Sequence, residues 1–107
     1  MAEEYVLALL PLPQTGDELM DWLLAFHGEL TFTSQEIDYH GLAPDELAGP
    51  EQVTGRQRRL LVRVRVSREQ LQPLLDGLEA AFPEAGWPYW VIPLHGSGRI
   101  GGGEAAN

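Results

Sequence analysis

Residues 60–66, with the sequence Leu60-Leu-Val-Arg-Val-Arg-Val66, alternate between apolar and charged side chains and predict the clearest strand in the chain. Successive residues of a strand point to opposite faces of a sheet. One face of this strand would therefore be wholly apolar, while the other would carry Arg63 and Arg65. The pattern predicts a sheet that is covered on one face and open on the other.

The residues that follow predict a helix and then a final strand. Ser67 stands three residues before Gln70, which is the spacing of a capping box. An apolar stripe at helical spacing continues through Leu71, Leu74, Leu75, Leu78 and Phe82. Pro73 falls early in this helix and predicts an irregular or kinked first turn. Residues 87–93 form a strand whose prolines suit a sheet edge.

The residues before the clearest strand predict a further strand, helix and strand. Residues 5–12 are apolar on both alternations, as expected for a strand at the centre of a sheet. Thr15 and Glu18 form a second capping-box pattern, for a helix that would end at His27 and Gly28. Residues 30–39 read as a strand whose alternation changes phase, so we expect a bulge near residues 34–36.

The order strand, helix, strand, strand, helix, strand predicts an α+β fold, the ferredoxin-like βαββαβ sandwich. Both helices would cover one face of a four-stranded antiparallel sheet, with a long loop between the second and third strands. We expect one domain over residues 1–95 and a flexible, glycine-rich tail over residues 96–107. The uncovered sheet face, which would carry Thr31 and Thr33 as well as the two arginines, predicts an oligomer.

The predicted long loop spans residues 38–59 and is acidic where it begins and arginine-rich where it ends. Its glycines and prolines leave room for one helical turn at most, over residues 43–47. Arg56, Arg58 and Arg59 suit a small anion, because a guanidinium donates two parallel hydrogen bonds to phosphate or carboxylate. Alternatively, these arginines neutralise neighbouring acids or pair across a subunit contact.

Composition restricts the class of partner. The net charge is −9 and residues 1–55 contain no Lys or Arg, which argues against nucleic-acid binding. The longest apolar run, residues 5–13, is far shorter than the roughly 20 residues of a membrane span. The chain has no cysteine, which excludes thiolate catalysis and thiolate metal sites. We expect a cytoplasmic protein without direct membrane insertion.

The histidines offer few metal ligands. His40 and Asp38 would share a strand face, and copies around a symmetry axis could complete a metal site. Alternatively, His40 is an ordinary loop histidine. No nucleophile, base and orienting group share a motif, so we predict no enzyme activity. A small isomerase or monooxygenase is the alternative, and it would need a pocket between helices and sheet.

Three segments carry a resemblance to a known group of proteins. Residues 40–42, residues 51–59 and residues 89–93 are similar to an uncharacterised bacterial family of the PII-like superfamily. That superfamily includes the nitrogen-regulatory PII proteins and the CutA-type cation-tolerance proteins. The resemblance covers about residues 5–100, and members of the family tend to be encoded beside heavy-metal efflux pumps.

The resemblance implies a homotrimer and a non-enzymatic regulatory function. Residues 39–58 match the loop that meets a ligand or partner, so we predict a small anionic ligand or a partner protein bound by Arg56, Arg58, Arg59 and Tyr39. The partner would be an efflux-system protein. Residues 82–88 contain no lysine and no glycine cradle of the kind with which PII proteins hold ATP, so tight ATP binding of that kind is not expected. The alternative is CutA-like metal handling by His40 and Asp38.

Overall fold

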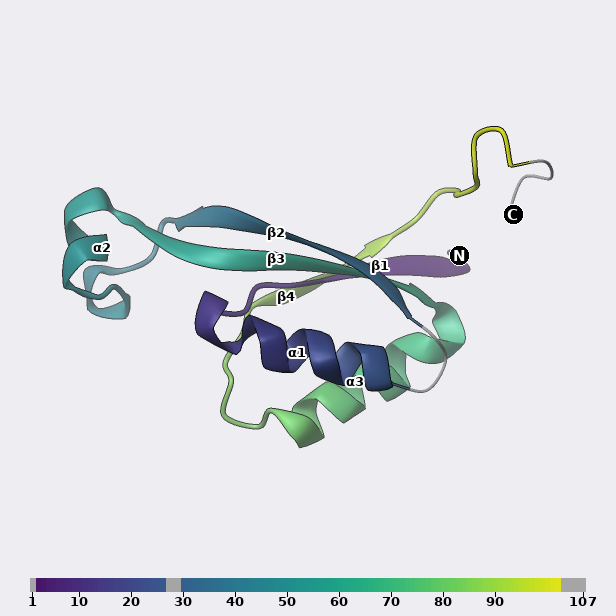
Figure 1. Ribbon diagram of the computed structural model, residues 1–107, viewed down its shortest axis with the longest axis horizontal. Helices are drawn as coiled ribbons and strands as arrows, with labels where there is room; N and C mark the ends of the chain where they lie inside the picture. Colours follow the sequence, from purple (N-terminus) through teal and green to yellow (C-terminus); the bar gives the residue numbers. More distant parts are fainter. Residues whose placement is uncertain (1, 27–29, 103–107) are drawn as a thin grey trace.

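The computed structural model describes residues 2–26 and 30–102. Its strands form one antiparallel sheet in the order β2-β3-β1-β4, and the two longer helices lie on one face of it (Figure 1). The α+β ferredoxin-like class is thereby confirmed. The elements along the chain are β1 (Glu4–Leu9), α1 (Pro13–Ala25), β2 (Thr31–His40), the 3-10 turn η1 (Pro44–Glu46), α2 (Gly49–Thr54), β3 (Arg56–Ser67), α3 (Arg68–Ala81) and β4 (Tyr89–Pro93).

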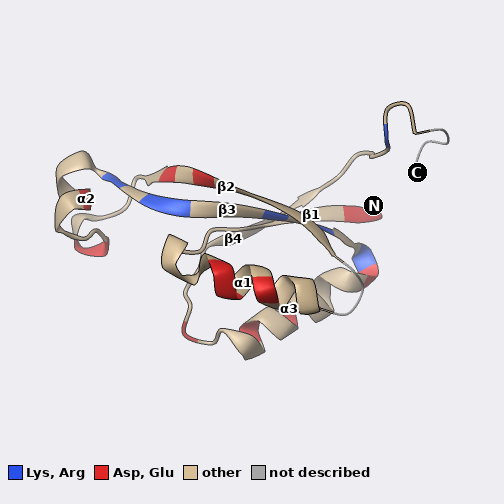
Figure 2. Cartoon of the chain, viewed as in Figure 1, with Lys and Arg blue, Asp and Glu red and all other residues tan. Residues whose placement is uncertain are grey.

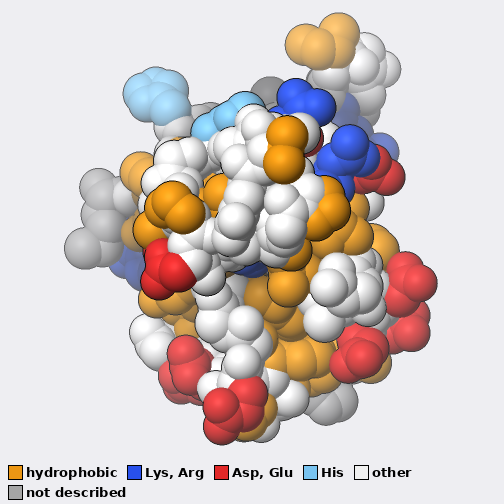
Figure 3. Space-filling view, turned by 90° about the vertical axis from the view of Figure 1, so that its left-hand side faces the viewer, with side chains coloured by type: hydrophobic (Ala, Val, Ile, Leu, Met, Phe, Trp, Pro, Cys, Tyr) orange, Lys and Arg blue, Asp and Glu red, His pale blue; other side chains and the backbone are white. Residues whose placement is uncertain are grey.

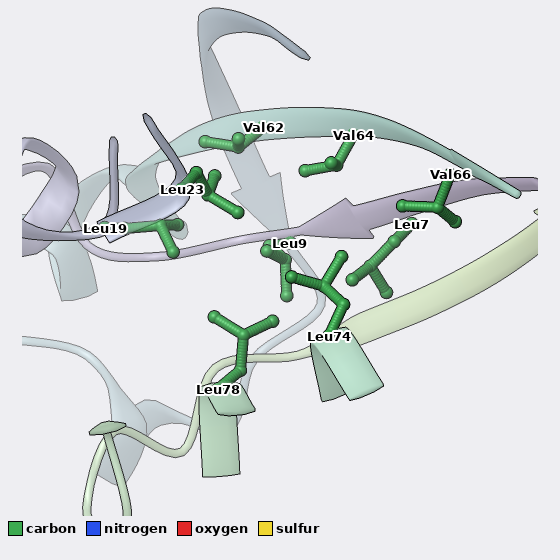
Figure 4. Packing of buried hydrophobic residues seen from close by; sticks show 9 residues of the cluster. All are labelled: Leu7, Leu9, Leu19, Leu23, Val62, Val64, Val66, Leu74 and Leu78. Atoms are coloured by element: carbon green, nitrogen blue, oxygen red, sulfur yellow. The ribbon is translucent and has the colours of Figure 1, made fainter. Parts of the chain in front are cut away.

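The hydrophobic core lies between the sheet and helices α1 and α3. Alternate residues of β1 and β3 face the helices, and each helix presents leucines at helical spacing to the sheet (Figure 4). Burial of these side chains is the main source of stability, at about 25 cal/mol per Å² of apolar surface. The buried cluster consists of Leu7, Leu9, Leu19, Leu23, Val62, Val64, Val66, Leu74 and Leu78.

The two long helices begin differently. The capping box of α3 is confirmed: the amide of Ser67 donates to Gln70 Oε1 at 2.9 Å, and the amide of Gln70 donates to Ser67 Oγ at 3.2 Å. The helix continues from Arg68 through Pro73 to Ala81.

The capping box predicted for the first helix is wrong, because α1 begins at Pro13, two residues before Thr15. Proline favours this first position, where no backbone donor is needed. Thr15 lies inside the helix, and its hydroxyl donates to the carbonyl of Leu12 at 3.0 Å. The predicted end at His27 and Gly28 lies outside the described residues.

The third strand is longer than predicted, and the second strand is more regular. Pairing runs without interruption from Thr31 opposite Arg65 to His40 opposite Arg56, so the predicted bulge is wrong. The phase change has another cause. Phe32 faces the helices, whereas Ile37 lies on the opposite face. Most side chains of β2 around Ile37 are exposed, so this part of the strand covers little of the core. Without a core on one side, alternation no longer has to keep one phase.

Residues 35–61, which we call the arm, replace the predicted long loop. The ends of β2 and β3 form a two-stranded ribbon, and residues 41–55 fold over its end as a tip that contains η1 and α2 (Figure 1). Within the tip, Gln52 Nε2 donates to the carbonyls of Pro44 at 2.9 Å and Leu47 at 3.1 Å. The helical turn predicted over residues 43–47 is present as η1, but the prediction of one turn at most is wrong, because α2 follows it.

Candidate functional site

One face of the arm carries a balanced set of charges. Arg58 Nη1 donates to Glu36 Oε1 at 2.6 Å, and Arg58 Nε lies 3.5 Å from Asp38 Oδ1. Arg56 Nε lies 3.8 Å from the same carboxylate oxygen. These side chains are each at least a third exposed, so water screens the pairs and each adds little stability. The alternative in which these arginines neutralise neighbouring acids therefore describes Arg56 and Arg58.

The opposite face of the arm holds a different kind of cation, Arg59. Its Nε donates to Gln57 Oε1 at 2.7 Å, and its Nη1 donates to the carbonyl of Leu10, also at 2.7 Å. Its guanidinium carbon lies 5.7 Å from the centroid of the Tyr39 ring, within the range of a cation–π contact. No carboxylate forms an ion pair with Arg59 in the part of the chain that the structure describes.

Partial burial removes some of the water that would otherwise solvate the charge of Arg59. Partial burial lowers the pKa of the Arg59 guanidinium, while Tyr39 and Glu51 act in the opposite direction. The group remains charged at neutral pH, because the ordinary pKa of an arginine lies far above neutral. Arg59 is thus a partly desolvated cation whose direct partners are neutral. A group of this kind favours an anion close to it.

Hydrogen bonds connect Arg59 to the tip. Gln57 is 7% exposed, and its Nε2 donates a long hydrogen bond, of 3.4 Å, to Glu51 Oε1. The same oxygen accepts a 2.8 Å hydrogen bond from the amide of Ala48, at the start of α2. A continuous connection, which we call the relay, therefore runs from Leu10 through Arg59, Gln57 and Glu51 to Ala48.

The structure divides the predicted ligand-binding residues between the two faces of the ribbon. Tyr39 and Arg59 lie together on one face, whereas Arg56 and Arg58 lie on the other with Asp38 and His40. Sequence reasoning missed Gln57, Glu51 and the Leu10 carbonyl. The alternation of Gln57 with Arg59 would have revealed their shared face, had the third strand been extended back to residue 56.

The predicted metal ligands share a face but form no assembled site. Asp38 and His40 are two residues apart in β2 and lie opposite Arg58 and Arg56. Across residues 2–26 and 30–102, no three His, Asp or Glu side chains come together in a way that could hold a metal ion. Because Asp38 also faces two arginines, metal binding by this pair stays a prediction that needs ligands from further copies.

Charge is distributed unevenly over the molecule. Arginines follow β3, and acidic side chains lie on the adjacent part of β2 and on α1 (Figure 2). From the α2 end, arginines and acids meet near the top of the molecule, while the helical half below carries acids alone (Figure 3). The arm is therefore one region in which an anion would meet positive charge.

Residues 82–88 form one wall of a groove of about 380 Å³. Asp76 and Glu79 also line this groove, and none of its lining residues is basic. Trp87 and Tyr89 lie in its wall, whereas Trp90 lies on the other face of the sheet, next to Ala8. The lining of this groove therefore carries negative charge and no positive charge.

The fold is similar to that of a solved structure. The crystal structure of a DUF3240 family protein from Shewanella baltica OS155 superposes with a TM-score of 0.75, at 18% sequence identity. The match covers 94% of this chain and 99% of that chain. No curated protein matches. None of the described helices is long and apolar enough to cross a membrane.

The family itself is identified from the sequence as a whole. The family model described as "Protein of unknown function (DUF3240)" matches residues 1–101, which include the sheet, both long helices and the arm. The chain belongs to the DUF3240 family.

Proposed function

We propose that this chain is a non-enzymatic regulatory protein of the PII-like type, and that its arm binds a small anionic ligand or an acidic partner protein. The observation that carries the proposal is Arg59, a partly buried cation that has neutral hydrogen-bond partners and no carboxylate at ion-pair distance among the described residues. Charge-assisted hydrogen bonds between the guanidinium and an oxyanion would supply the affinity.

The hydrogen-bonding capacity of Arg59 leaves room for a ligand. A guanidinium has five N–H donors, and two of them are used by Gln57 and Leu10. The remaining donors could form a bidentate pair with phosphate or carboxylate. Such a ligand would reposition the guanidinium to which Gln57 is hydrogen-bonded, and Gln57 contacts the tip through Glu51. Binding would thereby change the tip, which is the regulatory step that we propose.

Arg56 and Arg58 would bind a ligand only by exchanging their present carboxylate partners for it. Each already faces a carboxylate of the same arm, so an incoming acidic group gains little there unless it replaces Glu36 or Asp38. A protein surface that carries several carboxylates could make that exchange more readily than a single small ion could. These two arginines would therefore favour an acidic partner, while Arg59 would serve either kind of ligand.

Calorimetric titration with inorganic pyrophosphate tests the proposal. We expect Arg59→Gln to weaken binding by roughly tenfold or more, since a charge-assisted hydrogen bond contributes about 1.5–3 kcal/mol. Arg99→Gln removes the same charge from an exposed position and is the matched control. Equal affinities in the two variants would show that pyrophosphate responds only to net charge, and the proposal would fail for small anions.

We propose in addition that the protein is a cytoplasmic homotrimer whose open sheet face forms the subunit contact. Trp90 is 43% and Ile92 45% exposed, and they lie beside Ala8 and Val6 on the face away from the helices. An exposed apolar sheet face of this kind favours self-association. Native mass spectrometry of the wild type and of Trp90→Asp tests it: we expect a trimer that the substitution dissociates, and a monomeric wild type would contradict it.

The link to heavy-metal efflux rests on the resemblance alone. We propose an efflux-system protein as the partner of the arm. Pull-down with the wild-type arm and with an Arg56→Glu, Arg58→Glu variant would test this partner. Capture of the same efflux protein by both forms would contradict recognition through these arginines.

A further inference from the structure

We propose that the groove beside α3 binds a small organic cation that has an apolar body. The groove has a volume of about 380 Å³ and lies between α3, residues 82–88 and the start of β4. That volume falls within the range of small-molecule sites, which is roughly 300–1,000 Å³. None of the residues that line it belongs to the arm, so this site is separate from the anion site proposed there.

The groove has an aromatic wall and an apolar floor. Phe82 and Trp87 pack against each other with ring centroids 4.9 Å apart, and Tyr89, which also lines the groove, is 52% exposed. Leu9 and Leu78 close the floor and are themselves almost fully buried. The faces of aromatic rings carry negative potential, so such a wall attracts cations as well as apolar groups.

Two carboxylates add negative charge to the same groove. Asp76 and Glu79 are three residues apart on α3 and therefore lie on one side of the helix. Gln72 Nε2 donates to Asp76 Oδ1 at 2.9 Å, which holds one of these carboxylates in place. In Figure 3, apolar side chains are exposed between acidic groups in the helical half of the molecule. Because no lining residue is basic, the charge of the groove complements a cation.

The wall of the groove is held in place at both ends. The amide of Ala85 donates to the carbonyl of Phe82 at 3.2 Å, and the amide of Leu10 donates to the carbonyl of Pro88 at 3.0 Å. Pro88 has a fixed φ, and Gly86 supplies the left-handed turn at φ 65°. A wall that is already ordered loses little conformational freedom when a ligand binds.

These features select the ligand class. An inorganic metal ion would need several oxygen or nitrogen ligands at once, and two carboxylates on an open groove do not provide them. An anion would meet only negative charge. An alkylated ammonium group satisfies both the aromatic wall and the carboxylates, while its hydrocarbon part covers the leucine floor.

Choline and its uncharged isostere 3,3-dimethylbutan-1-ol are the probes, and titration by ¹H–¹⁵N NMR is the measurement. We expect choline to shift the signals of residues 82–89 and to bind roughly fivefold or more tightly than the alcohol, because only the ammonium gains the cation–π attraction. Equal binding of the two probes, or choline shifts confined to other residues, would overturn the proposal. This comparison uses the wild type and does not depend on any variant folding.

A pair of double variants tests the carboxylates. Asp76→Asn with Glu79→Gln should weaken choline binding by roughly fivefold, whereas Asp21→Asn with Glu18→Gln removes the same charge from exposed positions on α1 and should leave it unchanged. If both double variants weaken choline equally, the effect belongs to net charge and the assigned site is wrong.

Discussion

Arg59 and Leu10 are 49 residues apart in the chain, yet the guanidinium of one donates a 2.7 Å hydrogen bond to the main-chain carbonyl of the other. Leu10 is fully buried and follows directly after the central strand β1. The arm is therefore attached to the body of the protein through a side chain that also contacts Tyr39 and Gln57. A ligand at Arg59 would act where the arm meets the core.

Glu51 should control the order of the tip. Glu51→Ala removes the acceptor of the Ala48 amide and of Gln57, so we expect faster amide hydrogen exchange at Gln52 and Gly55. Loss of about 1 kcal/mol predicts a roughly fivefold increase. Glu51→Gln keeps an acceptor oxygen and is the control. Unchanged exchange in Glu51→Ala would show that the relay does not stabilise α2.

Glu4 should make stability depend on pH in the acid range. Hydrogen bonds from Arg65, at 3.0 and 3.1 Å, and from Ser97, at 2.7 Å, hold the pKa of the Glu4 carboxyl below its ordinary value of 4.5. Because the folded pKa is the lower one, the contribution is fully present above pH 4.5 and disappears as the pH falls through the folded value.

The matched variant for this prediction is Glu4→Gln. Its Tm should lie below that of the wild type at neutral pH, and the difference should shrink as the pH falls below 4.5. Thermal unfolding monitored by circular dichroism gives both values. A difference that stays constant down to the acid limit would contradict the assigned role of the Glu4 carboxylate.

Gly16 should be intolerant of a side chain. A methyl group added at this buried position of α1 would overlap Cδ1 of Leu60 on β3. Forcing Leu60 to move should cost about 1–3 kcal/mol and outweigh the gain of up to about 1 kcal/mol from better helix propensity. Urea unfolding should therefore show a lower free energy of unfolding for Gly16→Ala than for the wild type.

A second substitution checks the cause of that loss. In a Leu60→Ala background the shorter side chain no longer meets the new methyl group, so the cost of Gly16→Ala should fall or reverse. Strict additivity of the two substitutions would mean that Leu60 is not the obstacle.

Ser67 should contribute to stability as the cap of α3. Ser67→Ala removes the acceptor of the Gln70 amide, and we expect a loss of about 1 kcal/mol in the free energy of unfolding. Ser34→Ala, at an exposed position of β2, is the control and should change stability by less than about 0.5 kcal/mol. Equal effects would rule out the capping contribution.

The elements that pack against the core could be predicted from the sequence. Val62, Val64 and Val66 alternate because one face of β3 is buried, and Leu74 and Leu78 recur at helical spacing for the same reason. Such periodicity follows directly from burial. The four-stranded antiparallel sheet and the two-helix layer then followed from the succession of elements.

The arm could not be predicted in the same way, because little of it faces a core. Its ribbon is held mainly by pairing between β2 and β3, which leaves no period in the sequence around Arg56 and Arg58. Gly55, with φ 72°, ends α2 and directly precedes β3. From the sequence alone, a glycine at this position is equally compatible with a loop. The candidate residues were therefore found by their chemistry, while their separation onto two faces required the structure.

The central claim is that an anion at Arg59 is felt at the tip, and one NMR titration of the wild type with pyrophosphate tests it most directly. The account predicts that the Arg59 Nε–H signal and the Ala48 amide signal shift together, with one dissociation constant, because Gln57 and Glu51 connect them. A shift at Ala48 or at exposed arginines without any response of the Arg59 signal would contradict it.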